Sequence, residues 1–215
     1  MTATVTAGVL TIGKRDGTDA GGATGTVYFD GGTFTANSVV MAAKTNAGTG
    51  AATATLNISN GVFTVNSGGS FTLASQSGSG TASGTLNITG GKLVSNVDIK
   101  DGGGAATSTI NLNGGTLDMT GHNIGDATNN IDAVNLLAGT LKNVAQINGG
   151  ATALTKTGAG TLYLAGTNSY SGATVASAGT LWARSQTASR GRPRSRSNPE
   201  HPSGTPRVLL ETISR

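Results

Sequence analysis

Residues 85–93 read Thr-Leu-Asn-Ile-Thr-Gly-Gly-Lys-Leu, which is an apolar and polar alternation, a glycine pair and a second alternation. Alternation with period two is typical of a β-strand with one buried face, and glycines permit a tight turn between two strands. Related phrases return at intervals of 24 to 30 residues. Such a period indicates a stack of units that cannot bury their apolar faces alone. The phrases begin at Thr26, Thr55, Thr85, Thr109, Ala133 and Thr161.

A third short strand is predicted in each repeat, at residues 39–41, 70–73, 97–99 and 123–124. The chain also opens with such a strand, at residues 9–13. Three strands with Gly or Asn corners make one coil, and stacked coils place equivalent residues about 4.8 Å apart. We therefore expect an all-β chain, a parallel β-helix of about six to seven three-stranded coils. Its outer columns would contain Thr26, Thr55, Thr85 and Thr109, and Asn57, Asn87, Asn111 and Asn135.

Between the third strand and the next repeat, segments rich in small residues vary in length. Residues 42–54, 74–84, 100–108 and 125–132 contain few large apolar side chains. We expect exposed loops along one edge of the stack, because solenoids accommodate length changes in loops.

Composition agrees with a slender stack. Of the 35 Gly, 33 precede Arg184, and residues 1–183 contain no Pro and no Glu. Apolar residues make up 36% and aromatic residues 4% of the chain, which is little for one compact core. Without Cys, the chain has neither disulfides nor a thiolate metal site.

The net charge divides the chain into a body, residues 1–183, and a tail, residues 184–215. The body carries seven basic residues and eight Asp, whereas the tail carries seven Arg and two Glu. No nucleic-acid partner is therefore expected on the body. The tail contains all four Pro and is predicted to be disordered, with a short helical turn as an option at residues 208–213. An arginine-rich tether to nucleic acid or to an anionic surface is the alternative.

The amino-terminal residues lack the basic and apolar regions of a secretory signal. Because the first strand resembles the third strand of a coil, nothing before it would cap the stack. We expect either a fragment of a longer protein or a second subunit that covers this end.

Residues 154–175 read Leu-Thr-Lys-Thr-Gly-Ala-Gly-Thr-Leu-Tyr-Leu-Ala-Gly-Thr-Asn-Ser-Tyr-Ser-Gly-Ala-Thr-Val, and Ala-Gly-Thr-Leu follows at 178–181. This stretch closely resembles the passenger-associated repeat of bacterial autotransporters, here at residues 154–183. The resemblance implies a right-handed β-helical passenger that is exported across the outer membrane and then displayed or released. It also implies that the repeat assists folding and transport, and that a translocator barrel absent from this chain anchors the passenger.

The carboxylates of the body are the candidate catalytic or metal-binding groups. In the predicted register, Asp30 aligns with Ser59, Thr89 and Asn113, and Asp118 with Thr64 and Lys142, so neither has a carboxylate partner for hydrolysis. Asp101 and Asp126 should be neighbours in adjacent coils. They are either two solvated turn residues or, with Asp98 or Asp132, ligands of a Ca²⁺ ion. His122 and His201 are isolated. We predict no catalytic, cofactor-binding or metal-binding residue, and no cofactor.

These observations favour a non-catalytic structural or adhesive module of a secreted or cell-surface protein. Its contacts would lie on exposed faces and on the loops at 42–54 and 74–84. A host-surface or extracellular polysaccharide is the expected partner. One alternative is a carbohydrate-active β-helix. Another is a binder of regular surfaces, such as ice or crystalline polysaccharide, through the Thr-x-Asn columns.

Overall fold

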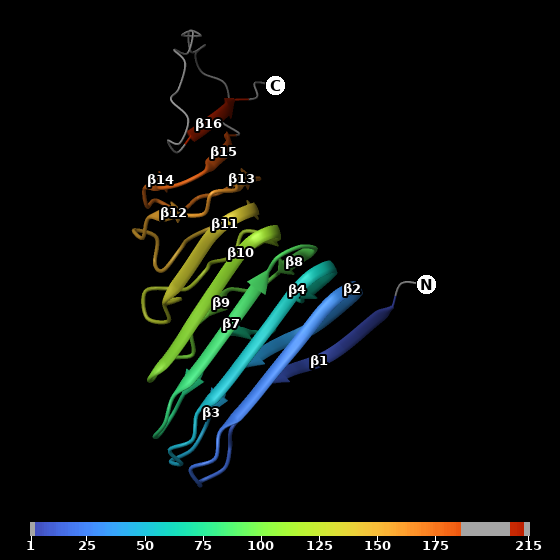
Figure 1. Ribbon diagram of the computed structural model, residues 1–215, viewed down its shortest axis with the longest axis vertical. Coiled ribbons are helices and arrows are strands. Elements are labelled where there is room, and N and C mark those ends of the chain that lie inside the picture. Colours follow the sequence, from blue (N-terminus) through green and yellow to red (C-terminus); the bar gives the residue numbers. More distant parts are fainter. Residues whose placement is uncertain (1–2, 186–206, 213–215) are drawn as a thin grey trace.

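The computed structural model describes residues 3–185 and 207–212, and the regular elements in these ranges are β-strands (Figure 1). Within the described residues no helix has the length and apolarity needed to cross a membrane. The strands are β1 (Thr4–Ile12), β2 (Ala23–Met41), β3 (Ala43–Lys44), β4 (Ala52–Val65), β5 (Phe71–Thr72), β6 (Ser75–Gln76), β7 (Ala82–Ile88), β8 (Lys92–Ser95), β9 (Ile99–Lys100), β10 (Ala106–Asp118), β11 (Ala133–Lys142), β12 (Leu154–Lys156), β13 (Thr161–Ala165), β14 (Thr174–Ala176), β15 (Thr180–Ser185) and β16 (Arg207–Thr212).

The first face of the fold is a row of parallel strands that follow one another in sequence order. β2, β4, β7, β10 and β11 lie side by side along the long axis (Figure 1). Their pairing places equivalent repeat positions opposite one another, so the predicted threonine and asparagine columns are confirmed. The chain therefore forms a β-helix-like stack of parallel strands.

Two further rows of pairings complete the stack. On the second face, the end of β2 pairs with β1 and β4, and β8 pairs with β4 and β10. The third face is a parallel column through Leu10, Val39, Phe71, Ile99, Ile124 and Ile147. The predicted third strands at 9–13 and 39–41 lie in β1 and β2, and those at 70–73 and 97–99 are reduced to the two-residue strands β5 and β9. At 123–124 the structure has an isolated bridge at Ile124 and no strand, so this prediction is confirmed in part.

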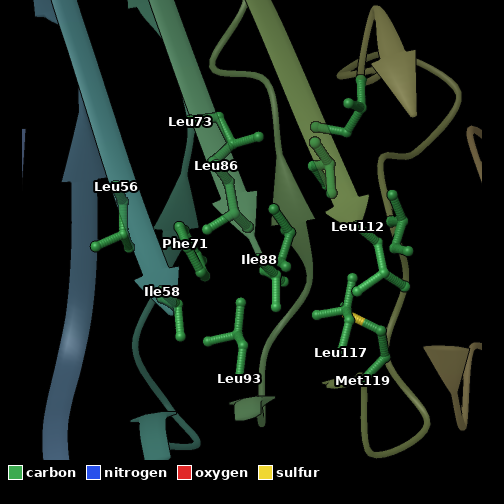
Figure 2. Packing of buried hydrophobic residues seen from close by; sticks show 14 of the residues in the cluster. Leu56, Ile58, Phe71, Leu73, Leu86, Ile88, Leu93, Leu112, Leu117 and Met119 are labelled. Atoms are coloured by element: carbon green, nitrogen blue, oxygen red, sulfur yellow. The ribbon is translucent and has the colours of Figure 1, made fainter. Parts of the chain in front are cut away.

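The core lies between these faces and is built from columns of inward residues, to which each rung contributes several side chains (Figure 2). Leu56 and Leu86 occupy one inward column of the first face, and Ile58 and Ile88 occupy the next; all four are fully buried. On the second face, Phe63 and the residues aligned with it form an inward column. Burial of each such side chain contributes about 1.5–3 kcal/mol, so the narrow core is the main source of stability.

The corner between the first and second faces requires glycine. Gly61 has φ +76°, a left-handed conformation that side chains with a Cβ rarely adopt. A Cβ there would also lie 2.5 Å from the carbonyl oxygen of Gly32, the corner glycine of the preceding rung. Both the backbone angle and the close stacking of coils therefore select glycine.

The sixth repeat phrase lies on a different face from the one predicted. Tyr163 pairs with Thr140 of the second face, while Lys156 pairs with Leu136 of the first. The alignment of Thr161 with Ala133 was therefore wrong. Alternation alone does not distinguish first-face from second-face strands. The short first-face strand β12 is also difficult to recognise in the sequence, because Lys156 places a charged residue in a column that is otherwise apolar.

The register differs from prediction at Asp30 and agrees with it at Asp118. Asp30 pairs with Asn60 and not with Ser59, because the register shifts after Phe29. The predicted alignment of Asp118 is confirmed, since it pairs with Lys142 on one side and shares Val94 as a neighbour with Thr64 on the other.

The loops at 42–54 and 74–84 are less exposed than predicted. β3 pairs with β6, and Lys44 in β3 also forms a bridge with Arg15. Ala43 and Lys44 are buried. Residues 52–54 and 82–84 belong to β4 and β7, where small side chains face inward. The prediction was wrong at these positions, because small residues here allow close packing, whereas residues 45–51 and 77–81 lie outside strands and are largely exposed, as predicted.

Most of the predicted tail, including its Pro-containing stretch and His201, lies outside the described residues. Within the tail, Arg184 and Ser185 end β15, and Arg207–Thr212 form β16, which runs parallel to β15. At these positions the chain is a strand, so neither the predicted disorder nor the helical turn at residues 208–213 agrees with the structure there.

Candidate functional site

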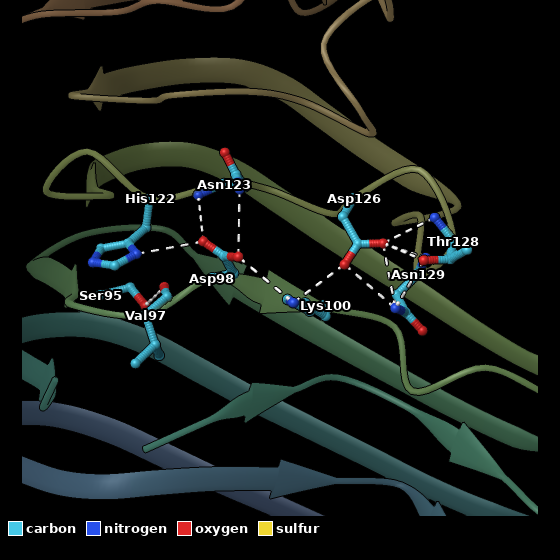
Figure 3. A network of polar contacts seen from close by, with 9 residues as sticks. All are labelled: Ser95, Val97, Asp98, Lys100, His122, Asn123, Asp126, Thr128 and Asn129. Atoms are coloured by element: carbon cyan, nitrogen blue, oxygen red, sulfur yellow. Dashed lines mark hydrogen bonds and ion pairs between the residues drawn. The ribbon is translucent and has the colours of Figure 1, made fainter. Parts of the chain in front are cut away.

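A cluster of charged side chains lies on the third face, between two adjacent coils (Figure 3). The Lys100 ammonium is 3.2 Å from Asp126 Oδ2 and 3.6 Å from Asp98 Oδ2. Asp98 Oδ1 accepts a 2.9 Å hydrogen bond from the Asn123 N–H. Because Ile99 and Ile124 pair in parallel, the residues that flank them meet across the coil boundary.

Both carboxylates of this cluster are held in the ionised form. Burial opposes ionisation of Asp98, but the Asn123 N–H and the Lys100 charge outweigh it and lower its pKa. The N–H groups of Thr128 and Asn129 lower the pKa of Asp126 strongly. The hydrogen bond to Asp126 in turn raises the pKa of Lys100. A glycosidase needs one protonated carboxyl as general acid, and neither aspartate is suited to this.

Asp101 and Asp126 follow the paired Ile99 and Ile124 at the same offset, and each accepts a hydrogen bond from the N–H two residues on, but their surroundings differ. Asp126 binds Lys100 and its own loop, whereas Asp101 is 7% exposed and accepts a 2.6 Å hydrogen bond from the Gly103 N–H. Its Oδ2 is buried and has no hydrogen-bond partner among the described residues. Across residues 3–185 and 207–212, no three His, Asp or Glu side chains gather closely enough to hold a metal ion.

The structure brings together a pair that the sequence reasoning missed. His122 Nδ1 lies 3.4 Å from Asp98 Oδ1, and both line a groove of 340 Å³ with Phe71, Thr72, Val97 and Lys100. Only the register of Ile99 against Ile124 could have revealed this contact. Because Asp98 also contacts Lys100 and Asn123, its contact with His122 joins two adjacent coils.

The first face carries a different polar arrangement, a ladder of asparagine amides. Asn135 Nδ2 donates to Asn111 Oδ1, Asn111 to Asn87 and Asn87 to Asn57, at 2.8, 2.7 and 2.8 Å. Every amide has the same orientation, so the hydrogen bonds reinforce one another along the stack.

We expect Asn87→Ala to destabilise the protein by about 1–3 kcal/mol, because it removes two ladder bonds. Asn135→Ala removes one ladder bond, so its loss of stability should be about half as large. Urea unfolding followed by circular dichroism measures both. Equal losses for the two variants would contradict a contribution from the ladder.

The last coils, from Leu154 to Ala183, are fastened by residues of the predicted repeat motif. β12 pairs with β14 and β13 with β15 in parallel. Asn168 Oδ1 accepts a 3.0 Å bond from the Val144 N–H of the preceding coil, and Asn168 Nδ2 donates to the Ala165 carbonyl at 3.1 Å. The Tyr170 hydroxyl lies 2.9 Å from Thr174 Oγ1, and burial raises its pKa. The motif residues thus position the turn between β13 and β14.

The family model described as passenger-associated-transport-repeat matches residues 154–183. These residues form a passenger-associated-transport repeat. The match confirms the resemblance to autotransporter passengers seen in the sequence. No curated protein and no solved structure matches the chain.

The transport repeat contains a buried lysine. Lys156 pairs with Leu136 and Ala176 in an inward column and is fully buried. Its ammonium donates to the carbonyl oxygens of Gly158 and Ala178, the latter at 3.4 Å. Burial lowers the pKa of Lys156, because the charged form loses its hydration. The lysine therefore joins two successive coils of the repeat through backbone carbonyls.

A pH dependence follows from this burial. In the unfolded chain Lys156 binds its proton more tightly than in the folded one, so stability rises with pH between its lowered folded pKa and about 10.4. We expect the melting temperature of the unmodified protein to rise relative to that of Lys156→Met between pH 7 and pH 10. A difference in melting temperature between the two proteins that stays constant from pH 7 to pH 10 would contradict the lowered pKa.

Proposed function

We propose that this chain is a non-catalytic structural and adhesive part of an autotransporter-like passenger, secreted or displayed at the cell surface. The proposal includes a right-handed parallel β-helix of six to seven three-stranded coils. The observation that supports this proposal most directly is the transport repeat at 154–183. Its strands β12 and β13 pair with β11, so the repeat continues the same stack as the preceding coils.

The polar faces support a structural role. Asp118, which is buried, lies 3.3 Å from the Lys92 ammonium and 3.1 Å from the Lys142 ammonium, and it accepts a 2.7 Å bond from Asn143 Nδ2. Burial opposes its ionisation, yet these contacts lower its pKa. Its charge serves to bind neighbouring coils, as do those of Asp98 and Asp126.

Surface display tests the proposal. The full chain is placed between a signal sequence and an outer-membrane translocator barrel in a bacterial host, and exposure is measured by antibody binding to intact cells. We expect display of the whole chain, and a several-fold loss when residues 154–183 are deleted. A deletion of residues 82–105, a unit of similar length in the central coils, controls for shortening.

Adhesion of the displaying cells to glycan-coated surfaces tests the adhesive part. Equal display with and without residues 154–183 would contradict the role of the repeat, and display without adhesion would contradict the adhesive role. Cleavage of a polysaccharide by the purified full chain that is lost in Asp101→Ala would overturn the non-catalytic assignment.

A further inference from the structure

An uncharged polar surface covers the first face of the stack. The segments 23–29, 52–58, 82–88 and 106–112 contain no Asp, Glu, Lys, Arg or His. Their outward columns carry Thr, Ser and Asn, and no bulge interrupts the pairing within these segments. Charged polymers find no countercharge here, whereas a neutral, hydroxyl-rich ligand meets donors and acceptors at each rung.

The asparagine ladder ends in a free donor. Asn57 accepts from Asn87 through its Oδ1, but within the described residues its Nδ2 donates to no other group. Because three preceding bonds are aligned in one direction, Asn57 Nδ2 is the polarised donor end of the ladder. Its two N–H groups are available to a ligand.

An exposed aromatic ring lies directly beside this donor. Tyr28 pairs with Asn57 in the same outward column and is 78% exposed, more than any other large hydrophobic side chain in the described residues. Thr26 and Thr55 form the adjacent column, and their hydroxyls make no hydrogen bond within the described residues. A ring and convergent polar groups on a rigid strand can accommodate the apolar face and the hydroxyls of a pyranose.

We propose that Tyr28, Asn57 and the hydroxyls of Thr26 and Thr55 form a binding subsite for a neutral polysaccharide. The sugar ring stacks on Tyr28, and Asn57 Nδ2 donates to one of its hydroxyls. The chain of the polysaccharide follows the stack axis, where each rung offers the next threonine and asparagine. The subsite refines the adhesive role proposed above and names the chemical class of its ligand.

Retardation of the purified full chain in native gels measures this binding, with hydroxyethylcellulose and soluble starch as neutral probes and alginate as an anionic one. We expect retardation by at least one neutral probe and none by alginate. Tyr28→Ala should weaken binding about tenfold, the equivalent of about 1.4 kcal/mol. Tyr163→Ala removes a tyrosine that is 50% exposed on the second face, and it should leave binding unchanged.

Asn57→Val and Asn135→Val each remove one ladder bond, so they match in their effect on folding, but only Asn57→Val removes the free donor. Binding should fall in Asn57→Val and persist in Asn135→Val. Equal effects of the two, no retardation by the neutral probes, or stronger retardation by alginate would overturn the subsite. Two other results would also overturn the subsite. One is thermal hysteresis in ice without glycan binding, and the other is self-association that depends on Tyr28 without glycan binding.

The display experiment separates this inference from the proposed function. Adhesion that persists in Tyr28→Ala cells would overturn the subsite and leave the adhesive role intact. Glycan binding by the purified chain that depends on Tyr28, without display at the cell surface, would support the subsite and contradict the passenger role.

Discussion

Gly84→Ala is expected to destabilise the protein by about 3 kcal/mol or more, because backbone crosses the site that its Cβ would occupy. A Cβ at Gly84 would lie 1.7 Å from the carbonyl oxygen of Leu73 and 2.5 Å from its carbonyl carbon. Side chains can rotate away from such an overlap, but these are backbone atoms. Relief would require the Leu73 corner to separate from β7.

Gly31→Ala is the matched control. Gly31 is half-buried, but a Cβ there would meet nothing within 4 Å and the backbone is outside the left-handed region. We expect a change within about 0.5 kcal/mol for this variant. Urea unfolding monitored by circular dichroism compares the two. A small effect at Gly84 would show that the corner can move, contrary to the close packing seen here.

Phe63→Ala is expected to cost about 3–5 kcal/mol, since it empties the centre of the amino-terminal core. Phe63 is buried, with its ring centroid 4.8 Å from that of Phe34 in a stacked arrangement and 5.8 Å from that of Phe29 in an edge arrangement. Loss of this ring removes contacts to both neighbours and leaves a cavity that the strands cannot close without breaking their ladder.

The control for Phe63→Ala is Val62→Ala, the adjacent residue on the outward side, which is 38% exposed. Its loss should be below about 1 kcal/mol. Because a solenoid couples only neighbouring coils, hydrogen exchange should show early opening of β1, β2 and β4 in Phe63→Ala and unchanged protection in β10 and β11. Uniform loss of protection along the chain would contradict this local coupling.

Much of the candidate site depended on contacts that repeat spacing alone does not reveal. The asparagine column was predictable, because Asn57, Asn87 and Asn111 occupy the same place in successive phrases. The common orientation of their amides, and hence the free donor at Asn57, depends on hydrogen bonds between rungs. The contact of His122 with Asp98 likewise required the pairing of Ile99 with Ile124.

The sequence by itself determined the parallel stack, its inward and outward columns and the transport repeat at 154–183, because these follow from local alternation, corner glycines and a long motif. The tertiary structure alone decided that Tyr163 lies on the second face, that Lys156 is buried in the first, and that Leu73 crosses Gly84. The physical reason is that alternation specifies which side of a strand is buried. Which strand faces which depends on the path of the backbone through corners and loops of varying length.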